Sequence, residues 1–297
     1  MNGLTTDEIM EIALELSGFS DIPQDSGIHV PGMNIERVIL TMDVNVGLLH
    51  MAKQMGFDAV IGHHPCGVLL KQGEVYRRHI DLLEKHGVPR EKALAALAEC
   101  IDSVVRRTEN KRFRMMYYES PNQTVLEVDA ARLLGLPLMN IHNPLDETGR
   151  GILQAKIDVG ASKSPHWHLE DVLNLLAALP EARYAQVHYG ISPRIFIGEP
   201  DFEASKVVVV HGAKSAPNAE IIRFYWENGF RTLVVLHAES ETLERLRKNS
   251  GGNLICTGHF LGDSIGITPF IRALRERGLE VFCMGGIIDI RTGGMED

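Results

Sequence analysis

Short apolar runs rich in β-branched residues alternate along this chain with segments of helical periodicity. The runs have the length of buried strands, and they lie at residues 38–42, 59–62, 138–141, 194–197, 206–210, 232–236, 254–256 and 281–283. Helical segments separate most of them, among others at residues 46–54, 219–228, 241–248 and 268–277. This alternation predicts an α/β protein with mixed, largely parallel sheets flanked by helices.

Two segments add to this pattern. The first is an acidic amphipathic stretch near the N-terminus, for which Thr5 or Thr6 is the expected helix cap. The second runs from residue 71 to residue 131, where the sequence is charged, rich in Ala and Leu, and without a strand-like run; it predicts a helical excursion with a solvated face of both signs. We expect an N-terminal α/β lobe over residues 1–150, which contains this excursion, and a C-terminal α/β lobe over residues 151–297.

Composition narrows the function classes. A net charge of −9 argues against a general nucleic-acid binder, which needs clustered Lys and Arg. The longest run without charged residues, at 249–262, is too short for a membrane helix, and the N-terminus has no basic-then-apolar signal pattern. The four cysteines form no CxxC motif, so a reducing cytoplasm is the expected setting. Cys66 and Cys256 lie close to candidate histidine ligands, but burial in the core is the more frequent use of cysteine.

Histidines follow several of the predicted strands. His63 and His64 come directly after the strand at 59–62, and His259 follows the strand at 254–256 with Asp263 four residues later. Ligands in open α/β sheets gather beyond the carboxyl ends of strands, so we expect these loops to converge on one crevice.

A third segment repeats the same order of residues. The strand at 138–141 leads into His142, and Asp146 follows four residues later. Pro144 between them predicts a shaped loop and no helix interior. We assign Asp146 to the metal ligands, and His142 to substrate contact or to the orientation of the ligands.

The candidate ligands combine three imidazoles with two carboxylates: His63, His64, Asp146, His259 and Asp263. Such a mixed nitrogen and oxygen set suits two divalent ions of Zn, Mn, Fe, Co or Ni. Two neighbouring ions lower the pKa of a shared water towards neutrality and polarise a substrate oxygen, which is hydrolytic chemistry.

Further residues are open to two interpretations. His237 follows the strand at 232–236 and is a candidate to line the same cleft, as a catalytic residue beside His142. Asp43 follows the strand at 38–42 and either orients a ligand histidine or caps the helix that begins near residue 46. Asn45 competes with Asp43 for that cap.

Three segments resemble successive signatures of the Nif-three-like dinuclear metal-centre proteins, some of which carry the label type-two GTP cyclohydrolase I. They are TMDVNVGLLHMAKQMGFDAVIGHHP, IHNPLDETG and GGNLICTGHFLGD. The resemblance implies a two-lobed α/β fold with the metal site in the cleft between the lobes, assembled as a toroidal homohexamer. It also implies that His63 and His64 bind different ions and that Asp146 and His259 are ligands. The last ligand of the family is usually glutamate, and Asp263 takes that place here with a side chain one methylene shorter.

Two functions follow from these observations. The leading hypothesis is a cytoplasmic metal-dependent hydrolase that acts on a small substrate, either nucleotide-like or another ring or amide compound. The alternative is a metal-binding scaffold or regulatory protein without turnover.

Overall fold

A computed structural model describes residues 3–66, 72–119, 122–164, 166–212, 216–248 and 251–290 of the chain. All eight predicted strands are present, and a further strand, β1 (Gly27–Val30), precedes them. The predicted N-terminal helix is α1 (Thr6–Ser17), where the Thr5 side chain and the Glu8 side chain each bond the other's backbone N–H in a capping box. The predicted α/β architecture, with mixed sheets flanked by helices, is confirmed.

The chain divides into two compact units, each built from separate stretches of sequence. Unit 1 comprises Met1–Val75, Val104–Leu145 and Ile267–Asp289, and unit 2 comprises Tyr76–Ser103, Asp146–Gly266 and Ile290–Asp297. Folding of residues 1–150 and 151–297 as separate lobes stays a prediction.

Unit 1 is built on a five-stranded sheet with the order β1-β4-β3-β2-β9. Its remaining strands are β2 (Arg37–Thr41), β3 (Ala59–Gly62), β4 (Leu138–Asn140) and β9 (Glu280–Met284). β9, β2, β3 and β4 are parallel, and only the edge strand β1 is antiparallel to its neighbour. The carboxyl ends of the parallel strands therefore share one edge of the sheet, as in other open α/β sheets.

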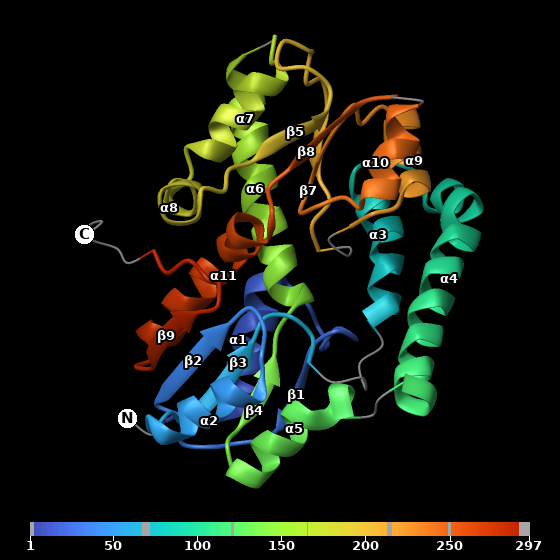
Figure 1. The fold of residues 1–297 in the computed structure, drawn as a ribbon. Helices are drawn as coiled ribbons and strands as arrows, with labels where there is room; N and C mark the ends of the chain where they lie inside the picture. The colour runs from blue at the N-terminus through green and yellow to red at the C-terminus, as the bar shows by residue number, and fades with distance from the viewer. Residues whose placement is uncertain are drawn as a thin grey trace. The chain divides into compact units, whose positions relative to one another are not determined.

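Helices cover both faces of this sheet, which explains why its strands are apolar on both sides (Figure 1). On one face, α1 and the last part of α11 (His259–Glu276) bury side chains such as Ile9 and Phe270 against Leu40 and Ile61. On the other face, α2 (Val46–Gln54) and α5 (Asn122–Leu134) pack against Ile39 and Val60.

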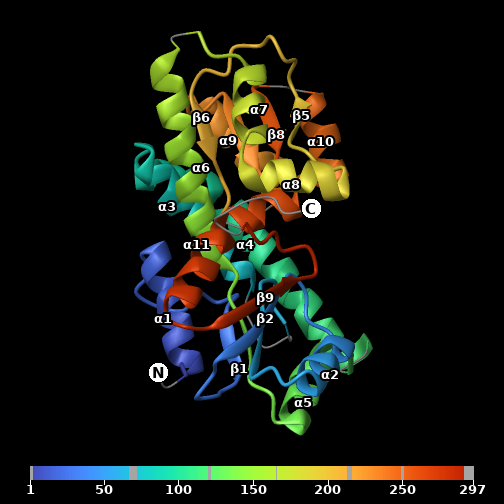
Figure 2. The same cartoon turned by 90° about the vertical axis from the view of Figure 1, so that its left-hand side faces the viewer.

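Unit 2 contains a four-stranded sheet with the order β5-β8-β7-β6. Its strands are β5 (Arg194–Ile197), β6 (Val207–Val209), β7 (Thr232–Val235) and β8 (Asn253–Cys256), and again only the edge strand, β5, is antiparallel. The flanking helices are α6 (Asn143–Lys163), α7 (Leu169–Ala177), α8 (Pro180–Tyr189), α9 (Ala219–Glu227) and α10 (Ser240–Arg247). Figure 2 shows α6, α7 and α8 in front of these strands and α9 and α10 behind them.

The segment from residue 71 to residue 131 contributes to both units. Its described elements are all helical: η1 (Gln72–Arg77), α3 (Arg78–Lys85), α4 (Arg90–Arg114), the π-helical turn η2 (Met115–Glu119) and the first part of α5. Lys71 and residues 120–121 lie outside the described residues. In unit 2, His79 of α3 is fully buried, and its Nδ1 lies 3.3 Å from the Tyr225 hydroxyl of α9.

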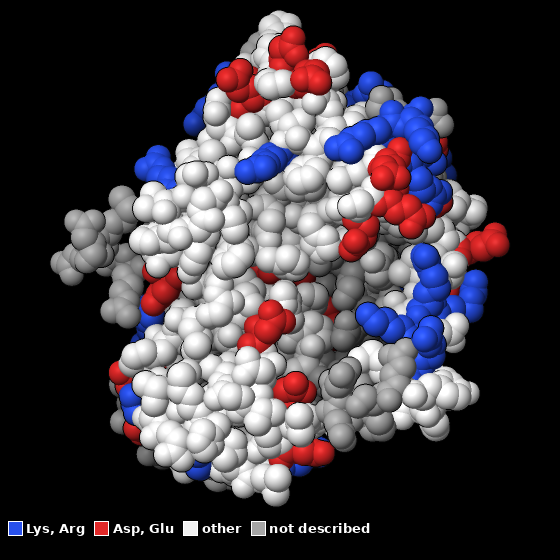
Figure 3. Space-filling model, viewed as in Figure 1, with Lys and Arg blue, Asp and Glu red and all other residues white. Residues whose placement is uncertain are grey.

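Charged side chains of both signs lie side by side on the surface shown in Figure 3. Over α9 and α10, for example, Arg245 is paired with Glu220. Within the part of the chain that the structure describes, no helix combines the length and the apolar character needed to cross a membrane.

Candidate metal centre

The parallel strands of unit 1 end in polar residues at one edge of the sheet. β2 leads into Asp43, β3 into His63 and His64, and β4 into His142. Pairing continues past the strand ends, since the His63 backbone N–H donates to the Thr41 carbonyl at 2.8 Å. The sheet itself therefore places the three predicted histidines of this unit.

His63, His64 and His142 form a compact group. Each offers a ring nitrogen, and these ligand atoms all lie within 4.8 Å of one another. Ring centroids are 5.0 Å apart for His63 and His142, 5.3 Å for His63 and His64, and 5.9 Å for His64 and His142. Gly62 permits this arrangement, because a Cβ there would lie only 2.8 Å from the Val44 side chain.

Oxygen atoms hold the rings of His63 and His64 in place. The His63 Nδ1 donates to the Ile141 carbonyl at 3.0 Å, and the His64 Nδ1 donates to the Asp43 carboxylate at 2.9 Å. Both acceptors lack a proton to give, so the proton of each neutral ring is on Nδ1 and the lone pair is on Nε2.

His142 is held in the same way by a residue that no local pattern of the sequence had indicated. Its Nδ1 donates to the Asp25 carboxylate at 2.5 Å, and its backbone N–H donates to the Ser26 hydroxyl at 2.9 Å. The Asn140 side chain donates to the Asp25 carbonyl at 2.8 Å and so ties this loop to β4. All three imidazoles are therefore in the tautomer with the proton on Nδ1 and the lone pair on Nε2. Histidines that bind a metal ion through Nε2 commonly donate their other N–H to an oxygen in this way. The donor set therefore fits a borderline divalent cation.

Asp43 and Asn45 divide the two roles that the sequence left open. The Asn45 side chain accepts from the Leu48 backbone N–H at 2.9 Å and caps α2. Asp43 orients His64 instead. The cap joins residues three positions apart in the sequence, whereas the contact between Asp43 and His64 requires β2 and β3 to lie side by side.

The parallel strands of unit 2 repeat this arrangement with histidines. β6 leads into His211, β7 into His237 and β8 into His259. The rings of His237 and His259 have centroids 5.0 Å apart. His237 therefore lies beside His259, and its predicted roles as a cleft-lining and catalytic residue stay predictions.

Asp146 and His259 lie in the first turns of helices and Asp263 lies one turn into a helix, whereas loops were predicted. α6 begins at Asn143, one residue before Pro144, because the missing N–H of proline costs nothing in the first turn of a helix. α11 begins at His259, so His259 and Asp263 stand one turn apart, and the His259 Nδ1 donates to the Asp263 carboxylate at 2.9 Å.

Glycines bring these two helices together within unit 2. A Cβ on Gly149 of α6 would lie 3.0 Å from the Gly266 backbone nitrogen and 3.5 Å from the Gly262 carbonyl, both in α11. This backbone contact is less than one helical turn from Asp146 and about one turn from Asp263. The close approach of α6 and α11 therefore places the acidic residues of both helices in one neighbourhood.

His211 is a residue of this neighbourhood that the sequence argument had not assigned to the site. It is buried, and its Nε2 lies 3.4 Å from the Thr257 hydroxyl. Burial lowers the pKa of His211, although the carboxylates of Asp146 and Asp263 act in the opposite direction. The run VVVVHG at residues 207–212 has the same strand-then-histidine order as the assigned segments, and this signal could have identified it.

The two cysteines near the histidines are buried. Burial raises the pKa of Cys66 and of Cys256 to about 12, so both are thiols at neutral pH in the chain without a bound ion.

In unit 1, His63, His64 and His142 form a group that could hold a metal ion. In unit 2, the predicted ligands Asp146, His259 and Asp263 offer further nitrogen and oxygen donors.

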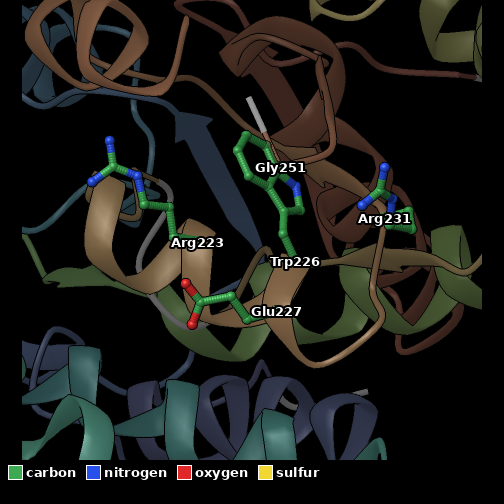
Figure 4. A pocket seen from close by; sticks show the side chains of 5 residues that line it. All are labelled: Arg223, Trp226, Glu227, Arg231 and Gly251. Atoms are coloured by element: carbon green, nitrogen blue, oxygen red, sulfur yellow. The ribbon is translucent and has the colours of Figure 1, made fainter. Parts of the chain in front are cut away.

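Unit 2 also has a pocket of about 370 Å³, at the amino ends of β7 and β8. Figure 4 shows Arg223 and Arg231 on opposite sides of Trp226. None of the described residues that line it is a histidine or an aspartate, so this pocket is separate from the donor groups at the carboxyl ends of the strands.

Comparison with known proteins identifies the family. The sequence matches no protein-family model, and no curated protein matches it. Among solved structures, a NIF3 superfamily protein from Sphaerobacter thermophilus matches with a TM-score of 0.84 and 35% identity, over 96% of this chain and 100% of that one. Reduced HcgD from Methanocaldococcus jannaschii matches with a TM-score of 0.55 and 12% identity, over 95% and 98% of the two chains. TTHA1606 from Thermus thermophilus matches with a TM-score of 0.52 and 17% identity, over 99% and 100%. The last two show the fold alone, whereas the first shows that this chain belongs to the NIF3 superfamily.

Proposed function

We propose that this chain is a dinuclear metal protein that uses two divalent ions for hydrolysis. The proposed ligands are His63 and His64 from unit 1, together with Asp146, His259 and Asp263 from unit 2. The observation that carries the proposal is the group of imidazoles in unit 1, whose ligand atoms lie within 4.8 Å and whose Nδ1 atoms are each held by an oxygen. Membership of the NIF3 superfamily supports it.

The protein residues prepare the site before any ion is bound. Asp43 holds the His64 ring and the Ile141 carbonyl holds the His63 ring, so neither side chain loses much rotamer freedom when an ion binds. Asp263 does the same for His259. Divalent ions held by such a set supply Lewis acidity and lower the pKa of water. The mixed donor set is compatible with Zn, Mn, Fe, Co or Ni.

For the substrate, we propose a small nucleotide-like molecule or another ring or amide compound. His237 is the proposed contact residue of unit 2, because it is partly exposed and its ring lies beside that of His259. We further propose that the chain acts in the cytoplasm as a homohexamer, in line with the resemblance of its sequence motifs. Light scattering coupled to size-exclusion chromatography would test the oligomeric state.

The test of the proposed function begins with metal content. Elemental analysis of the metal-replete protein is expected to give two ions per chain. His64→Ala and Asp146→Ala should each lower that number while the fold remains, and His50→Ala, at an exposed position of α2, should not. Retention of both ions by His64→Ala and Asp146→Ala would contradict the proposed ligands.

Turnover is measured on the same proteins. A screen of small phosphate, ring and amide compounds should reveal hydrolysis that a chelator abolishes and added metal restores. Activity that survives in a metal-free variant would refute the mechanism. Two bound ions without turnover of any compound would instead favour a metal-binding scaffold or regulatory protein.

A further inference from the structure

The carboxyl-terminal part of α4 and the turn η2 contain basic and aromatic residues that the metal centre does not use. Residues 106–118, with the sequence RRTENKRFRMMYY, include five basic residues and one acidic residue, a net charge of +4 in a chain whose net charge is −9. The acidic residue, Glu109, is paired with Arg112 at 3.0 Å. All of these residues belong to unit 1. The charge of this stretch is therefore opposite to that of the whole chain.

Several of the basic side chains form a row on the exposed face of α4. Arg107, Lys111 and Arg114 are exposed and follow one another at spacings of four and three residues, which places them on one side of the helix. Ile101 and Val105, which are buried, occupy the opposite side. Figure 3 shows Lys and Arg side chains gathered over the lower half of α4, as that helix is drawn in Figure 1. This face of the helix therefore offers a positive surface to solvent.

Three aromatic side chains lie at the end of the basic row. Phe113, Tyr117 and Tyr118 are 48%, 68% and 75% exposed. The rings of Phe113 and Tyr117 are stacked, with centroids 4.3 Å apart and an angle of 26° between their planes, and the Tyr118 ring centroid lies 5.8 Å from that of Phe113. A contiguous group of exposed aromatic rings, bordered by charged residues, marks an interaction site.

A single-stranded nucleic acid has the chemistry that matches both parts of this surface. Its backbone is a chain of negatively charged phosphates, which Lys and Arg side chains neutralise with the release of bound counterions. Its unpaired bases have open faces that stack on the rings of Tyr and Phe. Bases in a duplex are stacked on each other, so the aromatic part of the surface favours a single strand.

A lipid surface matches these observations less well. Helices that lie on membranes turn a broad apolar face, with residues such as Leu, Phe and Trp, towards the lipid. Here two of the three exposed rings have a phenol hydroxyl, and the aliphatic side chains of Ile101 and Val105 are buried in the protein. The observations therefore favour the nucleic acid.

We propose that residues 106–118 form a binding surface for a single-stranded nucleic acid. Bases stack on the three aromatic rings, and backbone phosphates contact the row of basic side chains. The negative charge of the whole chain argues against binding over its entire surface, but the positive charge of this stretch is local. The surface contains none of the proposed metal ligands and needs no bound ion, so the inference goes beyond the proposed hydrolytic function.

The experiment measures the fluorescence anisotropy of a labelled, single-stranded oligothymidine of about 12 nucleotides as the full chain is added. Binding should weaken steeply as the salt concentration rises, because cations compete for the phosphates. The titration is repeated with a chelator, so that contacts between phosphates and bound metal ions do not contribute. Equal affinity with and without the chelator separates this surface from the metal centre.

Substitutions of the aromatic residues test the stacking. Tyr117→Leu keeps an apolar side chain but removes the ring, so it should weaken binding by about 5- to 150-fold. Tyr117→Phe keeps the ring and should bind as the wild type does. Phe202→Leu is the matched control for Phe113→Leu, because Phe202 is also 48% exposed but lies in unit 2. Circular dichroism checks that each variant is folded.

Substitutions of the basic residues test the phosphate contacts. Lys111→Gln should lower the slope of log affinity against log salt concentration by about 0.7, the value for one phosphate contact with a single strand. Arg90→Gln is the control in the same helix, because Arg90 lies at the other end of α4 and is paired with Asp81. Its salt slope should equal that of the wild type.

Absence of binding in low salt at protein concentrations up to about 100 μM would overturn the inference. Equal affinities of the wild type and Tyr117→Leu, or equal salt slopes of Lys111→Gln and Arg90→Gln, would also overturn it. Binding of phosphatidylserine vesicles in place of the oligonucleotide would assign the surface to a membrane. Self-association that Tyr117→Leu abolishes would assign it to a second copy of the chain, and either result contradicts the proposal.

Discussion

The contact between α6 and α11 offers a sharp test of how unit 2 positions its acidic residues. Gly149→Ala would place a methyl group 3.0 Å from the Gly266 backbone nitrogen and 3.2 Å from the Gly266 Cα. Neither atom can move away without moving α11. Gly151, two residues further along the same helix, has nothing within 4 Å of the position of a Cβ, so Gly151→Ala is a matched control.

The two variants differ in packing but not in helix propensity. Replacing glycine by alanine in a helix interior stabilises it by about 0.5–1 kcal/mol, and this gain is common to both positions. At Gly149 the forced separation of α6 and α11 adds an overpacking cost of about 1–3 kcal/mol. Gly149→Ala is therefore expected to be less stable than Gly151→Ala by about 1–3 kcal/mol. The gain in helix propensity is the same in both variants, so it cancels when their free energies of unfolding are subtracted.

Urea unfolding followed by circular dichroism, with equal slopes for the two variants, measures this difference. The same shift should weaken metal binding in Gly149→Ala, because it moves Asp146 relative to α11 and a metal site depends on the geometry of its ligands. Gly151→Ala should be slightly stabilised and should bind metal as the wild type does. Equal stability and equal metal affinity of the two variants would refute the idea that this glycine contact positions Asp146 relative to α11.

Three further outcomes are expected. Burial lowers the pKa of His79 to about 3 from the ordinary value of 6.5. The unfolded chain therefore takes up a proton below pH 6.5 and the folded chain does not, so stability is lost as the pH falls. The free energy of unfolding should fall by about 2 kcal/mol between pH 7.5 and pH 5. Urea unfolding at both pH values measures this loss, and an equal loss in His79→Gln, which has no imidazole to protonate, would contradict the prediction. Asp43→Asn should weaken metal binding about 10-fold in chelator competition, with little change in stability. Asn45→Ala should cost about 1 kcal/mol of stability and leave metal binding unchanged. The opposite pattern would mean that Asp43 caps α2 and that Asn45 supports the metal site. Added metal at 100 times its Kd should stabilise the wild type by about 2.7 kcal/mol, and His64→Ala by much less, in thermal unfolding.

The α/β class and the strand positions could be predicted because they depend on local patterns. A strand buried on both faces must be apolar over its length, and the eight runs that met this condition are all strands. β1 was missed because its sequence, GIHV, contains a histidine, and its half-buried residues lie at the sheet edge. The starts of α6 and α11 were missed for another reason. Proline and glycine near residues 144 and 258 indicate a turn, but both are compatible with the start of a helix.

The order of strand and histidine along the chain was enough to select His63, His64, His142, His237 and His259 as candidates, because the carboxyl ends of parallel strands meet at one edge of a sheet. Their partners could not be selected in this way. Asp25 lies 117 residues before His142 in the sequence, and its role exists only because β1 and β4 are neighbours.

The sequence by itself therefore determined the fold class and which residue types stand at the strand ends, since both follow from patterns a few residues long. Tertiary structure alone decided which oxygen holds each imidazole, that Asp43 serves His64 while Asn45 caps α2, and that α6 and α11 meet at Gly149. These features depend on contacts between segments far apart in the chain. A local pattern has no information about such contacts, because they exist only once the sheets and helices are packed.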